Sequence, residues 1–279
     1  MTRFLLFAFL TMFAQLTLAQ NSSLRILTEN WPPMSFEKSG TPQGMAVELA
    51  ELLQKRMGAI DKIEVVPWPR AYHLVTTQPN VLLFTMIKTP ERQRLVTLLG
   101  PIANGEIALF ARRSFPDDPR DLQKNYSIGV HRGTAFQKTL EERGFKKIVA
   151  VNSPVNNIKM LMAGRIDFVC DDVLVIKELL NQAGYPNDAY KKIRPLYHSS
   201  LYFAFSKGTD PKVMNAWKNA LEEVKKSGEF KTLHKKWFGD HPAPSEVTLL
   251  SPPGAFQAVL PATKSPEEFI SNIVTSGIY

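Results

Sequence analysis

The sequence contains a single cysteine, Cys170, well inside a chain of 279 residues. One cysteine cannot form a disulfide within the chain, and no cysteine lies near the amino terminus to carry a lipid. Beyond the first residues, no apolar run approaches the roughly 20 residues that a membrane helix needs. We therefore expect a processed chain without internal disulfides, without a lipid anchor and without a membrane span.

Patterns typical of several catalytic and binding sites are also absent. The histidines show no metal-ligand spacing, and there is no G-x-S-x-G elbow, no H-E-x-x-H pair and no phosphate-binding glycine loop. Lysine and arginine outnumber aspartate and glutamate by 34 to 26, but no basic stripe is interleaved with aromatic residues. We expect no cofactor, no metal and no nucleic-acid partner. Acid–base chemistry by Asp171, Asp172 or His131 stays open.

The first 19 residues have the parts of a secretory signal peptide. Arg3 precedes an apolar run over 4–13, and Thr17, Leu18 and Ala19 form a cleavage site before Gln20. The apolar run is too short to span a bilayer comfortably. We predict a signal peptide over 1–19 and a protein released into the periplasm, not a lipoprotein.

Strand patterns alternate with helix patterns from residue 24 to about residue 205, which predicts an α/β protein with parallel sheets. The expected strands cover 24–28, 63–66, 81–87, 108–111, 127–131, 148–151, 168–170 and 202–205. The expected helices begin near Met45, Trp68, Pro90, Thr134, Val155, Val173, Asp210 and Phe230. The helix from Met45 should end at Gly58, a residue typical of helix ends.

The length of the chain exceeds that of most single domains, so we expect two lobes. The predicted first lobe is discontinuous and combines 20–111 with 202–240, while the second covers 112–201. Residues 241–279 are rich in proline and form a predicted tail, with one short helix beginning at Ser265. Two crossings between the lobes would serve as a hinge.

The apolar run 81–87 ends abruptly at Lys88, Thr89 and Pro90. A run of this kind predicts a strand covered on both faces, and such strands deliver ligand-binding residues at their carboxyl ends. Thr89 is a good helix cap, so Arg92 would lie in the first helical turn. A guanidinium there suits a carboxylate, although Arg92 could also be a solvated surface charge.

Four segments in order carry a resemblance: the turn 29–36 (Glu-Asn-Trp-Pro-Pro-Met-Ser-Phe), the Thr-Pro-Glu-Arg of 89–92, 128–134 (Ile-Gly-Val-His-Arg-Gly-Thr) and the Gly-Arg-Ile-Asp of 164–167. Over about residues 24–239, the chain resembles the periplasmic solute-binding proteins of family 3, the polar amino-acid receptors of ABC transporters. The resemblance implies a two-lobed type II periplasmic-binding-protein fold that closes on a ligand in its cleft.

The resemblance to that family implies that Arg92 binds the carboxylate of the ligand. Asp172 matches the family's acidic residue that binds the ammonium group of the ligand. Asp171 competes with Asp172, because adjacent residues leaving a strand point to opposite sides. One would face the cleft while the other caps the next helix, and the capping argument favours Asp172 for the cleft.

Further residues are candidates for the ligand site. Gly133 and Thr134 stand where backbone N–H groups at a helix start could hold negative charge, or they form an ordinary cap. Trp31 could form a wall for the ligand or pack on its own lobe. Ile87 and His131 depart from the family pattern and leave the ligand class open.

We predict a monomeric receptor that binds a small carboxylate-bearing ligand, foremost an amino acid, and delivers it to an ABC permease. One alternative is an enzyme on the same scaffold, similar to cyclohexadienyl dehydratase. Another is a sensory or interaction module that docks through the tail.

Overall fold

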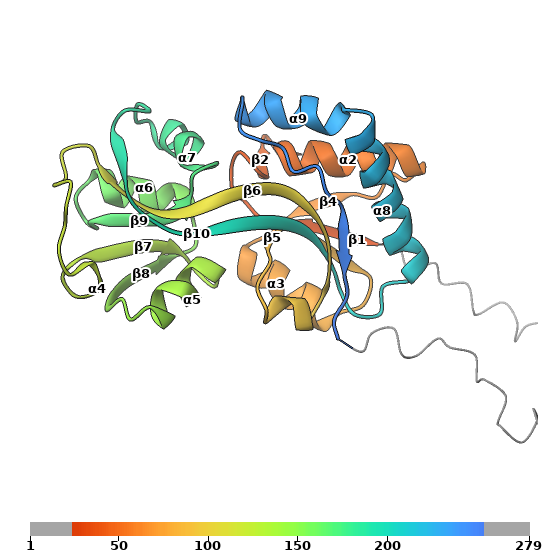
Figure 1. Ribbon diagram of the computed structural model, residues 1–279, viewed down its shortest axis with the longest axis horizontal. Coiled ribbons are helices and arrows are strands. Elements are labelled where there is room, and N and C mark those ends of the chain that lie inside the picture. Colours follow the sequence, from red (N-terminus) through yellow and green to blue (C-terminus); the bar gives the residue numbers. More distant parts are fainter. Residues whose placement is uncertain (1–23, 254–279) are drawn as a thin grey trace, which may run out of the picture.

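The computed structural model describes residues 24–253 (Figure 1). The predicted signal peptide and the helix expected at Ser265 lie outside these residues. The strands are β1 (Arg25–Thr28), β2 (Phe36–Lys38), β3 (Thr41–Gln43), β4 (Ile63–Val65), β5 (Val81–Ile87), β6 (Thr97–Arg112), β7 (Ser127–His131), β8 (Lys147–Val151), β9 (Phe168–Asp172), β10 (Tyr190–Phe205) and β11 (Thr248–Leu250).

The helices are α2 (Met45–Met57), α3 (Trp68–Thr77), α4 (Leu122–Asn125), α5 (Ala135–Glu142), α6 (Pro154–Met162), α7 (Ile176–Ala183), α8 (Pro211–Lys226) and α9 (Glu229–Phe238), with a 3-10 turn η1 (Arg92–Arg94). Several local expectations are confirmed. Every residue of β5 is buried, α2 ends at Gly58 in the left-handed conformation (φ 69°), and the Thr134 side chain caps α5.

The main sheet has the strand order β4-β1-β5-β10-β6-β9-β7-β8. Figure 1 shows β1, β4 and β5 with α2, α3, α8 and α9 on one side of the molecule, here called lobe 1. Strands β7, β8 and β9 with α5, α6 and α7 form lobe 2, and β6 and β10 run through both lobes (Figure 1). The predicted boundaries at residues 112 and 202 stay predictions.

The two shared strands differ from expectation. β6 and β10 each contain 16 residues and pair antiparallel, so the sheet is mixed rather than parallel. The sequence analysis placed only 108–111 and 202–205 in these strands. Gly100-Pro101 and Asn104-Gly105 are typical of turns, and Lys191, Lys192 and Arg194 of a solvated surface, so pairing partners distant in sequence override the local signals.

Two predicted helices are corrected. The helix expected from Val173 begins at Ile176, because β9 continues to Asp172. The helix expected after Thr89 is the short η1 turn, although Thr89 Oγ1 does accept a hydrogen bond from the Arg92 backbone N–H at 3.2 Å.

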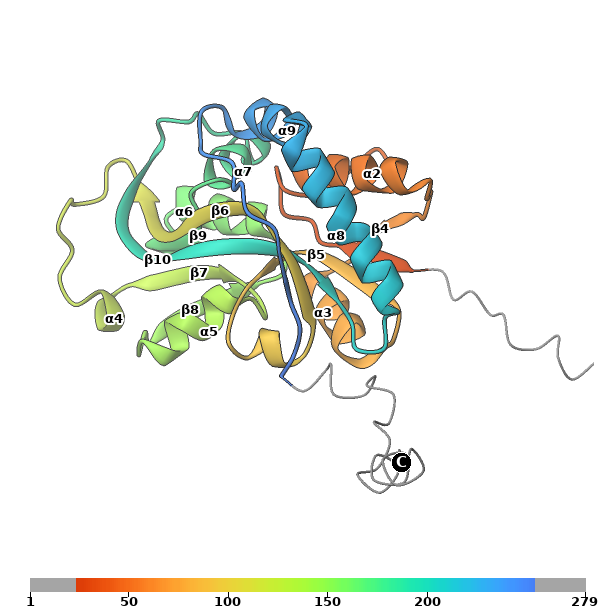
Figure 2. The same cartoon turned by 45° about the vertical axis from the view of Figure 1, so that its right-hand side comes forward.

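The segment after α9 belongs in part to lobe 1. Figure 2 shows it descending from α9 across the sheet, where β11 pairs antiparallel with Leu98–Gly100 of β6. Lys225 Nζ donates 2.7 Å hydrogen bonds to the carbonyl oxygens of Pro101 and Glu246. The first part of the predicted tail is therefore a structural element, and residues 254–279 lie outside the described range.

Candidate ligand site between the lobes

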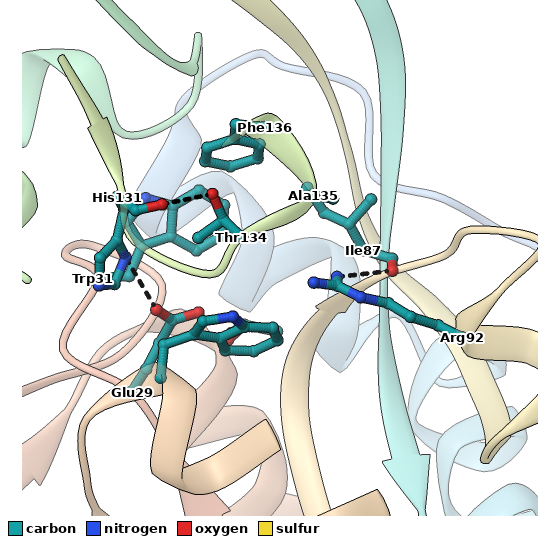
Figure 3. Close-up of a pocket in the computed structure, with 10 residues that line it drawn as sticks. Glu29, Trp31, Ile87, Arg92, His131, Thr134, Ala135 and Phe136 are labelled. Carbon is teal, nitrogen blue, oxygen red and sulfur yellow. Dashed lines mark hydrogen bonds and ion pairs between the residues drawn. The ribbon is translucent and has the colours of Figure 1, made fainter. Parts of the chain in front are cut away.

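A small pocket lies between the lobes, with a cavity volume of about 10 Å³ (Figure 3). Lobe 1 contributes residues after β1, at the start of α3, at the end of β5 and on η1, while lobe 2 contributes the end of β7 and the start of α5. The lining residues are Glu29, Trp31, Trp68, Thr85, Ile87, Arg92, His131, Thr134, Ala135 and Phe136. Carboxyl ends of parallel strands thus converge here, as expected for this class of fold.

Arg92 is the buried cation of the pocket, with 6 % of its surface exposed. Its Nη1 donates to the carbonyl oxygen of Ile87 at 3.1 Å, and its guanidinium packs 4.9 Å from the Trp68 ring and 5.3 Å from the Tyr72 ring. Among residues 24–253, no carboxylate lies within 4 Å of it. Burial lowers its pKa from the ordinary value, and the nearby Tyr72 and Glu29 oppose that shift.

Glu29 is a buried acid in the same pocket, and the sequence analysis did not single it out. Its Oε2 lies 3.4 Å from His131 Nδ1 (Figure 3) and has no hydrogen-bond partner within residues 24–253. Burial raises the pKa of Glu29 to about 8, partly offset by Arg92, and burial lowers the pKa of His131 to about 4. At neutral pH the pair is therefore a neutral carboxyl group facing a neutral imidazole rather than an ion pair.

Asp171 and Asp172 point to different surroundings. Asp171 Oδ1 accepts a 3.0 Å hydrogen bond from Trp31 Nε1 of lobe 1, and its buried Oδ2 has no hydrogen-bond partner in the described part of the chain. Asp172 accepts from Leu174 N at 2.9 Å and from Ser199 Oγ at 2.6 Å. Neither aspartate lines the pocket itself, but Asp171 bonds the lining residue Trp31. Burial raises the pKa of Asp171 to about 7 and that of Asp172 to about 6.

The preference for Asp172 in the cleft rested on a helix at Val173 that Asp171 would cap. That premise is wrong, because no helix begins at Val173 and α7 starts only at Ile176. Asp171 is the member that reaches lobe 1, and Asp172 is held between the shared strands β6 and β10, where its carboxylate lies against Gly105.

The model of the bacterial extracellular solute-binding proteins, family 3, matches residues 24–240. The chain belongs to this family. Its predicted two-lobed type II fold is also confirmed, because the solved structures similar to it include periplasmic binding proteins.

The chain is similar to three proteins of different description. The arginine-binding periplasmic protein of Mannheimia haemolytica is 24% identical over 232 residues, which cover 82% of this chain and 96% of that protein. An ancestral amino acid-binding protein, described as a precursor of cyclohexadienyl dehydratase, is 27% identical with a TM-score of 0.65 over 77% of this chain and 95% of that one. A histidine kinase sensor domain is 20% identical with a TM-score of 0.72 over 81% of this chain and 100% of that one.

Within this solute-binding protein, the structure brings five of the predicted site residues together around the pocket, namely Trp31, Ile87, Arg92, His131 and Thr134. Gly133 lines the adjoining groove at the mouth of the cleft, and its N–H already donates to Gln137 Oε1 at 2.9 Å. Trp31 does more than pack on its own lobe, since it contacts Phe136 and Asp171 of lobe 2.

The sequence analysis missed Glu29 and Thr85. Glu29 opens the turn 29–36 that carries the family resemblance, so its place in that segment was an available signal. Thr85 lies inside the apolar strand β5 with φ 69°, a conformation that β-branched residues rarely adopt and that clusters at functional sites. Nothing in an apolar run marks such a position.

Among residues 24–253, no helix is long and apolar enough to cross a bilayer, and no group of three metal-ligating side chains occurs.

Proposed function

We propose that the protein is an extracytoplasmic receptor that binds an amino acid, or a related small organic acid, between its lobes and delivers it to an ABC permease. The burial of Arg92 carries this proposal. A buried charge without a charged partner is costly, and a carboxylate offers the bidentate, charge-assisted bonds that a guanidinium needs. The arginine-binding relative supports an amino acid as the carboxylate-bearing ligand.

For the positive group of the ligand, we propose Glu29 and Asp171. Each has a buried oxygen that no described residue hydrogen-bonds, Oε2 of Glu29 and Oδ2 of Asp171. A cationic group beside them would favour their ionised forms. Asp172 is less suited, because Leu174 and Ser199 already occupy both of its oxygens.

Binding would proceed by closure about β6 and β10. These strands connect the lobes, and Ser200 Oγ bonds to Asn104 Oδ1 at 2.8 Å between them. Arg92 and Glu29 belong to lobe 1, while His131 and Asp171 belong to lobe 2. A ligand that touches both sets is bound best when the lobes are closed, so it shifts the population toward that form.

The test is calorimetric titration of residues 20–279 with a panel of amino acids and organic acids, beginning with L-arginine. We expect Arg92→Ala to weaken binding by about 30-fold or more, the factor that corresponds to about 2 kcal/mol. The control is Arg94→Ala, an exposed arginine on the same turn, which should bind as the parent does. Equal affinity of the Arg92→Ala variant would refute the proposed carboxylate site.

A second candidate function is a dehydratase on this scaffold. Glu29, with its pKa raised to about 8, is a neutral carboxylic acid at pH 7 and could act as a general acid. It would donate its proton to a departing hydroxyl group of a cyclohexadienyl acid, so that water leaves. The carbon–carbon bond to the carboxylate would break at the same time, releasing carbon dioxide and leaving its electrons in the ring. Turnover of prephenate that Glu29→Gln abolishes would establish this function over the receptor.

A further inference from the structure

Two tryptophans of lobe 1 each donate an indole N–H to lobe 2. Trp31 Nε1 donates to Asp171 Oδ1 at 3.0 Å, and Trp68 Nε1 donates to the carbonyl oxygen of Gly133 at 2.9 Å. Both tryptophans are 2 % exposed, and they come from different elements, the turn after β1 and the first turn of α3. The same type of bond therefore joins the lobes at two separate points of the pocket wall.

Each indole also touches a charged or ionisable group to which the proposed function gives a role in ligand binding. The Trp68 ring lies 4.9 Å from the Arg92 guanidinium, and Trp68 and Tyr72 pack against each other with ring centroids 5.8 Å apart. Trp31 bonds the carboxyl group of Asp171, whose other oxygen is unpartnered. A change in lobe closure would thus alter the surroundings of both Arg92 and Asp171.

The other polar contacts between the lobes are weaker. Lys138 of α5 pairs with Glu91 at the mouth of the cleft, where both side chains are more than half exposed and salt screens the pair. The contact between Glu29 and His131 is 3.4 Å long and joins two groups that are neutral at pH 7. The buried indole bonds are the better placed of these contacts to hold the lobes together.

We propose that Trp31 and Trp68 form an indole clasp that closes the lobes through direct contacts and holds Arg92 in position for the ligand carboxylate. This proposal deepens the receptor function above and rests on it for the role of Arg92. The clasp itself needs no ligand. It sets the fraction of closed protein, and with it the apparent affinity, because only the closed form offers both halves of the site.

The substitution Trp→Phe removes the N–H while keeping an aromatic ring. A typical hydrogen bond shifts an equilibrium by roughly 2- to 12-fold, so loss of both bonds should shift the closed-to-open ratio by about 4-fold or more. Trp237→Phe on α9 is the matched control, since Trp237 Nε1 has no hydrogen-bond partner among residues 24–253 and its ring packs on Phe36 of lobe 1.

The experiment measures the distance between spin labels on cysteines placed at Lys55 of α2 and Lys159 of α6, which are exposed on different lobes. Cys170 is buried and will not compete for the label. Without added ligand, we expect the W31F/W68F double variant to populate longer distances than the parent, with each single variant between them and W237F unchanged. A distance distribution identical to that of the parent would overturn the clasp.

Asp171→Ala gives a second route to the same bond if W31F does not fold. It removes the acceptor of Trp31 and keeps the indole, so it should open the lobes as W31F does. The combined W31F/D171A variant should open them no further, because both changes break one bond. Additive opening would show that the bond is not responsible.

Titration with L-arginine separates the clasp from the receptor function. A parent chain that binds neither L-arginine nor any other member of the amino-acid and organic-acid panel, with a W31F/W68F variant that opens, would refute the receptor function and leave the clasp. A parent that binds arginine, with a double variant that stays closed, would refute the clasp alone. If both the receptor function and the clasp are correct, W68F should weaken arginine binding by the same factor by which it lowers the closed fraction. We expect this loss of affinity to arise through faster dissociation.

Discussion

At the scale of residues, Glu29 and Arg92 are buried ionisable groups that line one pocket without bonding to each other. Burial disfavours the charged form of each and raises the pKa of Glu29 to about 8, which favours a protonated carboxyl group at pH 7. Burying two such groups unpaired lowers the free energy of unfolding. In return it leaves a site in which a zwitterion, or a substrate of a proton transfer, can supply the missing partners. The pH dependence of stability therefore reports on the pocket.

Glu29 should make the folded state less stable as pH rises. Its folded pKa lies above the unfolded value, so the folded state holds the proton more tightly, and the associated stability is complete below about pH 4.5 and lost as pH rises through 8. We expect Glu29→Gln to remove this loss and to exceed the parent in free energy of unfolding at pH 8 by a few kcal/mol, to order of magnitude. Urea unfolding at pH 5 and pH 8 measures the difference.

The control for this prediction is Glu222→Gln, an exposed residue of α8, which should follow the parent at both pH values. Asp171 and Asp172 also have raised pKa values, so some pH dependence will remain in Glu29→Gln. A variant with the same stability difference between pH 5 and pH 8 as the parent would show that Glu29 is not the group responsible.

At the scale of elements, the long strands β6 and β10 join the lobes, and β11 adds a further strand beside β6 in lobe 1. Sequence patterns found β5, β7 and α2 because their burial and their ends follow from local periodicity and turn chemistry. They missed most of β6 and β10. Pro101, Gly105 and the basic residues after Tyr190 are not typical of strands, and these strands form only because they pair with each other.

Lys225 should stabilise the contact between β11 and the rest of lobe 1. Its Nζ donates to the carbonyl oxygens of Pro101 and Glu246, and both oxygens lose this hydrogen bond when the ammonium group is removed. We expect Lys225→Ala to lower the free energy of unfolding by about 1–3 kcal/mol, measured by urea denaturation. Lys226→Ala, an exposed neighbour on α8, should change it by less than about 0.5 kcal/mol. Equal effects of the two substitutions would contradict this role.

At the scale of the whole molecule, the two lobes meet at the pocket and along the shared strands, and the segment 241–253 belongs to lobe 1 rather than to a separate tail. His241 Nε2 lies 2.7 Å from the carbonyl oxygen of Asn104, so this segment also touches β6 where it passes toward lobe 2. The alternative function, an interaction module that docks through the tail, must therefore be tested by removing residues 254–279 alone.

Truncation after Pro253 should leave the melting temperature and amino-acid binding of the chain unchanged, because β11 and its contacts remain. Truncation after Asp240 removes β11 and the bonds of Lys225 to Glu246 and of His241 to Asn104, and it should lower the melting temperature by several degrees. Scanning calorimetry of the two truncated chains compares them. Equal melting temperatures would mean that β11 contributes no stability.

The sequence by itself determined the family, the alternation of strands and helices, and the placement of Arg92 after a buried strand, because each depends on residues close together in the chain. Only the tertiary structure decided that Asp171 rather than Asp172 reaches lobe 1, that Trp68 joins the lobes, and that Glu29 is buried so that its pKa is raised. Trp31 and Asp171 are 140 residues apart and Trp68 and Gly133 are 65 apart. Such contacts, and the burial that shifts a pKa, arise only when distant segments pack together.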